Sequence, residues 1–171
     1  GPRRAGAVGS AEAAILLLCV VSGVDAELSA RLGELVGFYN KRAVKSMERG
    51  REGFAWAKLL LGRALGLTAR PERCGRVFLP KDARLRLRAT TLNNLGCLCR
   101  RKGKAHAALK HLETALEIES EIDGPLDDPA STHLNLCAIL SQLRQHKVAA
   151  KHARAAIDKI LAKMGVAEDA L

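Results

Sequence analysis

The chain has 171 residues, of which 48% are apolar and only 3% aromatic, and it carries 28 Lys and Arg against 18 Asp and Glu. This length suits one domain or a short array of repeats, and the few aromatic rings argue against a reader of RNA that stacks bases. The net charge of +10 falls in residues 1–100, because residues 101–171 hold ten basic and ten acidic residues. An acidic partner would meet the N-terminal half, although a solvated basic face is the simpler interpretation.

The N-terminal part is predicted to comprise a loose segment, residues 1–9, and a helical segment, residues 10–36. Residues 3–26 have the outline of a secretory signal, with two arginines before an apolar run. Glu12 at the edge of the run disfavours this interpretation, and a buried helix is preferred. The run is also too short to span a bilayer, which needs about 20 apolar residues.

Residues 37–68 are predicted to form a degenerate helical repeat. Asp25 is a suitable N-cap for a first helix that runs to Arg49, where Gly50 ends it. A second helix follows from Phe54 to Leu67. Two registers remain open for its packing positions, which are either Ala55, Leu59 and Gly62, or Ala57, Leu61 and Ala64.

The remaining elements are a loop or insertion at residues 69–82, a repeat at 83–124, a repeat at 125–165 and a tail at 166–171. Asp82 is expected to cap a helix over 83–102, and Gly103 to separate it from a helix over 104–122. Asp127 or Asp128 is expected to cap a helix over 129–144. The last helix is predicted over 148–164 from apolar residues at spacings of three and four.

A recurring pattern links these two repeats. The segment Thr91-Leu-Asn-Asn-Leu-Gly96 returns in altered form at Thr132-His-Leu-Asn-Leu-Cys137, and we call the offset from Thr91 to Thr132 the repeat length. Small and apolar residues follow both copies at the same offsets, as expected where helices cross closely. The sequence therefore predicts an all-α solenoid of antiparallel helix hairpins. The predicted packing residues are Leu92, Leu95, Gly96, Ala108, Leu112, Ala115, Leu136, Cys137, Ala149, Ala153 and Ala156.

These residues resemble the tetratricopeptide repeat, a helix-turn-helix unit. The repeat length, the Thr91–Leu95 segment and the Gly124-Pro125 and Asp128-Pro129 pairs are similar to the longer repeats of the kinesin light chain type. The second copy departs from the family at Cys137, where Gly or Ala is usual, and at Arg144, where Gly is usual. Arg144 is expected to give a turn without a left-handed residue, or a slightly distorted turn.

The resemblance implies an adaptor that binds a partner peptide or helix in a concave groove lined by the first helix of each repeat. Asn94 and Asn135 match asparagines that face this groove in the kinesin light chain type, and an amide can bind peptide main chain. The alternative is that both asparagines bond to neighbouring helices. The predicted groove residues are Asn93, Asn94, Cys97, Arg100, Arg101, Leu134, Asn135, Ala138, Ser141 and Gln142.

A second hypothesis places RNA or an anionic membrane surface on the basic N-terminal half. The candidate patch consists of Arg70, Arg73, Arg76, Arg84, Arg86 and Arg88. Nucleic acid and membrane are the less favoured partners, whereas self-association or further repeats would fit the small number of repeats.

Catalysis is not expected. The five histidines lack the i, i+4 spacing of a helical metal pair, the five cysteines fit no zinc pattern, and no glycine loop of the phosphate-binding type is present. The sequence therefore predicts no enzyme, no metal and no cofactor. Reduced cysteines suit a cytoplasmic protein, with cytoskeletal association as an extension of the resemblance.

Overall fold

The computed structural model describes residues 13–14, 26–69 and 79–165, and outside these ranges lie the predictions for the first helical segment, the secretory outline, most of the insertion and the tail. The predicted all-α class is confirmed, since the described elements are helices joined by turns. The helices are α2 (Ala26–Met47), α3 (Arg51–Leu67), α4 (Lys81–Arg101), α5 (Ala105–Ser120), α6 (Ser131–Gln142) and α7 (His146–Met164).

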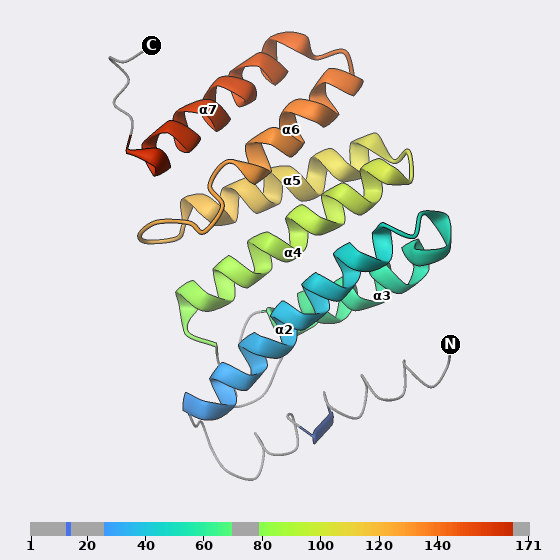
Figure 1. The fold of residues 1–171 in the computed structure, drawn as a ribbon, viewed down its shortest axis with the longest axis vertical. Coiled ribbons are helices and arrows are strands. Elements are labelled where there is room, and N and C mark those ends of the chain that lie inside the picture. Colours follow the sequence, from blue (N-terminus) through green and yellow to red (C-terminus); the bar gives the residue numbers. More distant parts are fainter. Residues whose placement is uncertain (1–12, 15–25, 70–78, 166–171) are drawn as a thin grey trace.

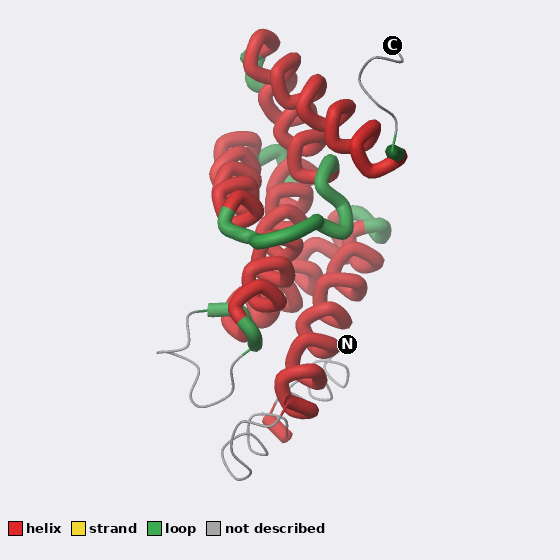
Figure 2. Tube along the Cα trace, turned by 90° about the vertical axis from the view of Figure 1, so that its left-hand side faces the viewer, coloured by secondary structure: helices red, strands yellow, loops and turns green. Residues whose placement is uncertain are grey.

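The helices form three antiparallel hairpins that stack in chain order. α2 pairs with α3, α4 with α5 and α6 with α7, and each hairpin packs on the next through α4 and α6. Figure 1 shows the hairpins following one another from α2 at one end to α7 at the other. The long connection between α5 and α6 crosses the outside of the stack in Figure 2. We call α2, α4 and α6 the first helices, and α3, α5 and α7 the second helices.

Each hairpin turns through a residue with a left-handed backbone. Gly50 has φ 67° and Gly103 has φ 72°, and glycine adopts such angles without a steric penalty. Arg144 occupies the same place in the third hairpin with φ 61°. The expectation of a turn without a left-handed residue was therefore wrong, because the hydrogen bonds that close the turn require this conformation whatever the side chain. Gln145 N donates to Leu140 O as Lys104 N donates to Cys99 O.

The crossing of α4 and α5 depends on the absence of a side chain at Gly96. A Cβ there would lie 2.6 Å from Cγ of Leu112 and 3.4 Å from the carbonyl oxygen of Ala108. Ala108 and Leu112 are 0% and 1% exposed. The two helices approach this closely only because glycine leaves room for the Leu112 side chain.

Two buried clusters form most of the core. The larger joins α2, α3 and α4, with Tyr39 completely buried among aliphatic side chains, and it extends to Ala115 of α5. The smaller joins the second and third hairpins through Leu112, Leu136 and Ile139. Each cluster spans the boundary between two hairpins, so none of the three hairpins encloses its core alone. Of the predicted packing residues, Cys137 and Ala153 are partly exposed. The remainder are buried, and they are Leu92, Leu95, Gly96, Ala108, Leu112, Ala115, Leu136, Ala149 and Ala156.

The first hairpin settles the open register of α3. Ala57, Leu61 and Ala64 are each 0% exposed, whereas Leu59 is 43% exposed and belongs to the outward set with Ala55 and Gly62. The division placed between residues 36 and 37 falls inside α2, because that helix continues unbroken to Met47 and pairs with α3.

A glycine that the pattern did not indicate is needed at the start of α3. A Cβ on Gly53 would lie 1.7 Å from the carbonyl oxygen of Ser46, a backbone atom that cannot rotate away.

The helix starts differ from the predicted caps. Asp82 lies in the first turn of α4, which begins after Pro80, and α6 begins after Ala130 rather than after Asp127 or Asp128. No side chain caps either start. Asp82 therefore contributes only negative charge near the positive end of α4.

Candidate functional site

Side-chain amides connect the first helices to one another. Asn94 of α4 donates from Nδ2 to Oδ1 of Asn40 on α2 at 3.0 Å. Asn40 is 5% exposed and donates in turn to Thr91 Oγ1 at 2.9 Å and to the carbonyl oxygen of Val36 at 3.1 Å. These bonds fix the spacing of α2 and α4 through buried polar contacts, which are stable only when they are satisfied.

The same arrangement recurs between α4 and α6. Asn135 donates from Nδ2 to Oδ1 of Asn93 at 2.9 Å, and Asn93 donates to Ser131 Oγ at 2.6 Å. Asn135 follows Asn94 by one repeat length, so one repeat position binds the preceding first helix in both cases. Leu134 of α6 follows Asn93 by the same offset and is 50% exposed. Because leucine replaces asparagine there, the row of amides does not continue beyond α6. We call Asn40, Asn93, Asn94 and Asn135 the amide ladder.

The ladder shows that Asn94 and Asn135 do bond to neighbouring helices, as the alternative interpretation held. Each uses at least one of the two N–H donors of its amide for this purpose. Oδ1 of Asn94 accepts no hydrogen bond from the described residues. Because no completely buried side-chain oxygen or nitrogen among them lacks a partner, this oxygen retains some contact with solvent. An amide held by its neighbours and open at one atom is oriented in advance for a ligand.

The other predicted groove residues divide between structural and open positions. Arg101 donates to the carbonyl oxygen of Met47 at 3.0 Å and so holds the C-terminal end of α2. Burial raises the pKa of the Cys97 thiol, and the charges of Arg100 and Arg101 and a hydrogen bond with Asn135 oppose this shift. A thiol with a raised pKa is a poor nucleophile. The exposed members are Arg100, Arg101, Leu134, Ala138, Ser141 and Gln142.

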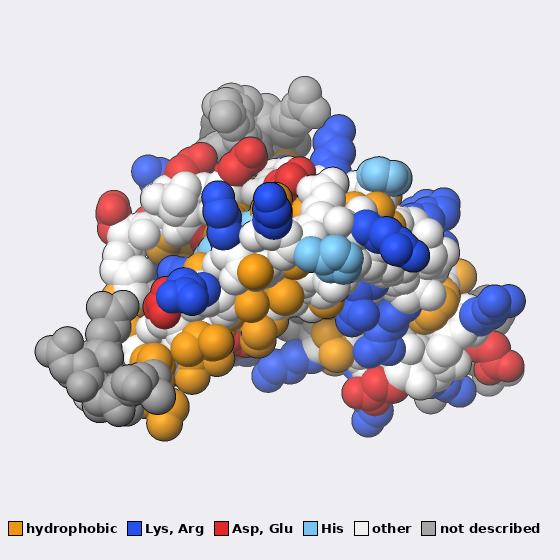
Figure 3. Space-filling model, turned by 90° about the horizontal axis from the view of Figure 1, so that it is seen from above, with side chains coloured by type: hydrophobic (Ala, Val, Ile, Leu, Met, Phe, Trp, Pro, Cys, Tyr) orange, Lys and Arg blue, Asp and Glu red, His pale blue; other side chains and the backbone are white. Residues whose placement is uncertain are grey.

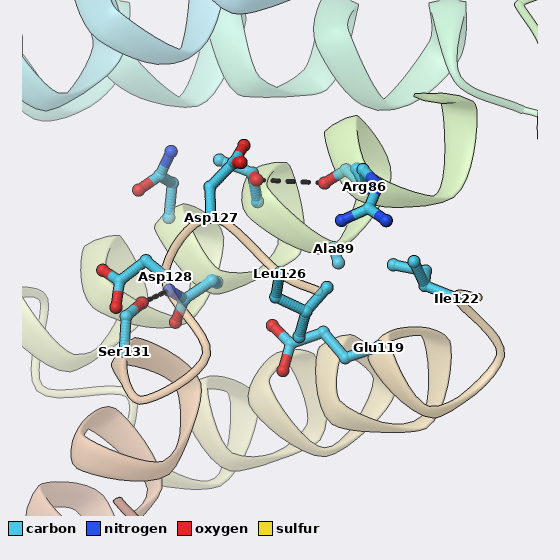
Figure 4. A pocket seen from close by; sticks show the side chains of 11 residues that line it. Arg86, Ala89, Glu119, Ile122, Leu126, Asp127, Asp128 and Ser131 are labelled. Atoms are coloured by element: carbon cyan, nitrogen blue, oxygen red, sulfur yellow. Dashed lines mark hydrogen bonds between the residues drawn. The ribbon is translucent and has the colours of Figure 1, made fainter. Parts of the chain in front are cut away.

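A cavity of about 360 Å³ opens between α4, the end of α5 and the connection that leads to α6. Thr90, Asn93 and Asn94 form its wall on α4, so it borders the amide ladder. Figure 4 shows Asp127 and Asp128 on the connection at one side, Ile122 at the other, and Leu126 between them. The cavity therefore combines apolar surface, amides and carboxylates beside the first helices, which the sequence pattern did not indicate.

Two arginines of the predicted basic patch bind main-chain carbonyl oxygens. Arg86 donates to the carbonyl oxygens of Pro125 at 2.5 Å and Asp123 at 3.1 Å, and so holds the α5–α6 connection. Arg88 donates to the carbonyl oxygens of Leu65 and Thr68 at the end of α3, at 3.2 and 3.3 Å. Arg84 is partly exposed, and Arg70, Arg73 and Arg76 lie outside the described residues. Two guanidinium groups are thus bound to main chain.

A histidine pair joins the helices of the third hairpin. Nδ1 of His133 and Nδ1 of His152 lie 3.0 Å apart, so one ring donates to the other and at least one ring is neutral. Burial lowers the pKa of both, and the proximity of His152 lowers the pKa of His133 further. Among the described residues no three His, Cys, Asp or Glu side chains come together as a metal site. The described helices also include none with the length and apolar content needed to cross a membrane.

The comparisons with known proteins agree with this geometry. The tetratricopeptide repeat family matches residues 87–159, which extend from α4 into α7. No curated protein and no solved structure matches the chain. The members of this family are in general protein-protein interaction modules rather than enzymes. Two hairpins related by one repeat length, a close crossing of α4 and α5 at a glycine, and the family match lead to one conclusion: residues 87–159 are tetratricopeptide repeats.

Proposed function

We propose that the chain is an adaptor that binds an extended segment or a helix of a partner protein on the surface of its first helices. The observation that supports this most is the amide ladder, which fixes the first helices to one another and orients the partly exposed amides of α4 and α6. Asparagine amides can bond to peptide main chain without demanding a particular side chain. The adjoining cavity would accept a side chain of the bound segment.

The domain division is part of this proposal. The first hairpin, α2 and α3, lies before the family match but contributes Asn40 to the ladder and packs on α4. We therefore regard it as a degenerate third repeat unit. It would extend the binding surface by one first helix.

The RNA or membrane alternative has less support from the described residues. Arg86 and Arg88, two of the six arginines proposed for it, bind main-chain carbonyl oxygens. The absence of a catalytic role and a cytoplasmic location remain parts of the proposal. Three cysteines in the described ranges, Cys97, Cys99 and Cys137, are free thiols, as a reducing compartment would keep them.

The test is a selection of binding peptides from a random library with the whole chain, followed by affinity measurements on matched variants. Ala138 on α6 and Ala107 on α5 are both exposed helical alanines. Ala138→Arg places a long side chain on the first-helix surface without disturbing the amide ladder, and Ala107→Arg makes the same change elsewhere. We expect the selected peptides to lose about tenfold or more in affinity with Ala138→Arg, and to bind Ala107→Arg as they bind the unaltered chain.

The salt dependence of binding distinguishes the peptide-binding hypothesis from the RNA or membrane hypothesis in the same experiment. A segment held by amides and apolar contacts should lose little affinity between low and moderate salt, whereas binding through phosphate contacts falls steeply with the logarithm of salt concentration. Peptides that bind both variants equally would refute the first-helix surface. A steep salt dependence with RNA as the tighter ligand would instead favour the alternative.

A further inference from the structure

One face of α7, at the end of the stack, carries exposed apolar side chains. Ile157 is 53% exposed, Ile160 is 40% exposed and Met164 is 70% exposed. Their spacings of three and four residues place them along one side of the helix. Figure 3, which views the molecule from this end, shows hydrophobic side chains gathered in a band toward the C-terminal side. We call Ile157, Ile160 and Met164 the end stripe.

The corresponding positions of α5 are covered by α6. Leu116 precedes Ile157 by one repeat length and packs into the cluster that contains Leu136 and Ile139 of α6. Glu119 precedes Ile160 by the same offset and accepts a hydrogen bond from Thr132 of α6 at 2.6 Å. The end stripe therefore continues, on α7, the interface through which a second helix holds the next first helix.

The net charge of α7 indicates which kind of helix would fit against the end stripe. α7 carries five basic residues, Lys147, Lys151, Arg154, Lys159 and Lys163, against the single acidic Asp158, which gives 5 − 1 = +4 before its histidines are counted. A second copy that presented its own α7 would bring the same charge to the interface, and like charges oppose association. A helix with acidic residues beside its apolar face would be attracted instead.

We infer that the end stripe is a docking site for an amphipathic helix of a partner protein, with acidic residues on both sides of its apolar face. The helix would lie on α7 as α6 lies on α5, with its apolar side chains over Ile157 and Ile160 and its carboxylates toward exposed basic residues of α7 such as Arg154. Lys163 already donates to the carbonyl oxygen of Asp127. This site is separate from the first-helix surface, because it lies on a second helix. The chain would then bind two segments at once.

The probe is a capped, fluorescently labelled peptide of about 20 residues with Leu and Ala on one helical face and Glu on the others. A matched peptide has Lys in place of Glu. We expect the Glu peptide to bind the whole chain about tenfold or more tightly than the Lys peptide in an anisotropy titration. The double substitution Ile157→Ser/Ile160→Ser should weaken the Glu peptide about tenfold or more, because apolar contact is lost.

The control is Leu59→Ser, which removes a leucine 43% exposed on α3, and it should leave binding unchanged. Equal binding of the Glu peptide to the double variant would overturn the inference, since only diffuse charge attraction would remain. Failure of the Glu peptide to bind would overturn it as well.

Two further measurements address other occupants of the stripe. Sedimentation should show the chain as a monomer, and a dimer that Ile157→Ser/Ile160→Ser dissolves would assign the stripe to a second copy. Thermal unfolding should change by no more than about 2 °C in the double variant, as expected for an open surface. A larger fall in Tm would show that another segment of this chain covers the stripe, and that result too would overturn the inference.

Discussion

The second and third hairpins solve the same packing problem with different residues. In the second, Gly96 leaves space that Leu112 fills, and a Cβ at Gly96 would come within 2.6 Å of the leucine. In the third, at the equivalent repeat positions, Cys137 replaces the glycine and Ala153 replaces the leucine. A larger residue on the first helix accompanies a smaller one on the second, which indicates that the repeat keeps the volume shared by the pair rather than either residue.

The turns of the two hairpins have the same backbone conformation, but the residue change between them is not balanced by a second change. Gly103 and Arg144 adopt nearly the same left-handed φ, 72° and 61°, but only glycine does so without a steric penalty. Hydrogen bonds to Cys99 O and Leu140 O close the two turns in the same way. The third hairpin therefore keeps the fold of the repeat at the cost of local strain in its turn, whereas its helix crossing combines a larger residue on α6 with a smaller residue on α7.

The largest effect should come from removing the partner of Gly96. Leu112→Ala deletes a side chain that is 1% exposed, and we expect it to lower the free energy of unfolding by about 3 kcal/mol. Urea denaturation would measure this loss. Leu59→Ala, at an exposed leucine of α3, serves as the control and should change stability by no more than about 0.5 kcal/mol. A loss below about 1 kcal/mol for Leu112→Ala would contradict the described crossing.

Two glycine-to-alanine substitutions should change the free energy of unfolding in opposite directions. Gly96→Ala forces Leu112 to move, and we expect a loss of about 2 kcal/mol. Gly62→Ala lies on an exposed part of α3 where a Cβ would meet nothing within 4 Å, so it should gain up to about 1 kcal/mol from helix propensity. Denaturation of both variants against the unaltered chain checks the prediction, and equal effects of one sign would refute it.

Substitutions at the two left-handed turn residues should change stability in opposite directions. Arg144→Gly relieves a left-handed arginine and should stabilise the chain by about 1 kcal/mol, whereas Gly103→Ala should destabilise it by about the same amount. Thermal unfolding would show the two shifts of Tm in opposite directions. An unchanged or lower Tm for Arg144→Gly would mean that the arginine side chain stabilises the turn by some other contact.

The smallest effect should be a pH dependence that is greatest in the third hairpin, where two histidines contribute, while burial also lowers the pKa of His111 on α5 of the second hairpin. Because the pKa values of His133 and His152 are lowered in the folded state, the unfolded chain takes up protons first as the pH falls below about 6.5. Stability is therefore present above that pH and is lost as the pH falls through it. The second hairpin has Leu92 at the repeat position that His133 occupies in the third.

Hydrogen exchange at pH 7.5 and pH 5.5, corrected for intrinsic rates, would locate this effect. We expect amide hydrogens of α6 and α7 to exchange several-fold faster at the lower pH, and His133→Leu to remove that difference. A change spread equally over all three hairpins would show that the histidine pair is not its source.

The sequence predicted the features that repeat. Gly96 and Cys137 stand at one offset from Ala108 and Ala149, so the pattern indicated the hairpins, the class and the family without coordinates. The helices were placed to within about two or three residues at most ends. The predicted caps of α4 and α6 were wrong, because Asp82, Asp127 and Asp128 are acceptable caps by residue type but lie at positions that do not cap.

Contacts between elements that do not repeat could not be predicted. Asn40 lies in a hairpin whose register the sequence left open, so its bond to Asn94 was not foreseen. Arg88 and Arg101 were assigned to binding surfaces, but they reach carbonyl oxygens at the ends of α3 and α2. Such partners depend on how far each hairpin is rotated on the next, which single-helix periodicity does not determine.

The claim on which this description depends is that the second and third hairpins are copies of one packing unit. A double-mutant cycle with Gly96→Cys and Leu112→Ala tests it directly, because together the two substitutions convert the second crossing into the third. We predict that the double variant loses less stability than the sum of the single variants, by about 1 to 3 kcal/mol, since the cysteine sulfur fills the space the leucine leaves. Additive losses, within about 0.5 kcal/mol, would contradict the claim.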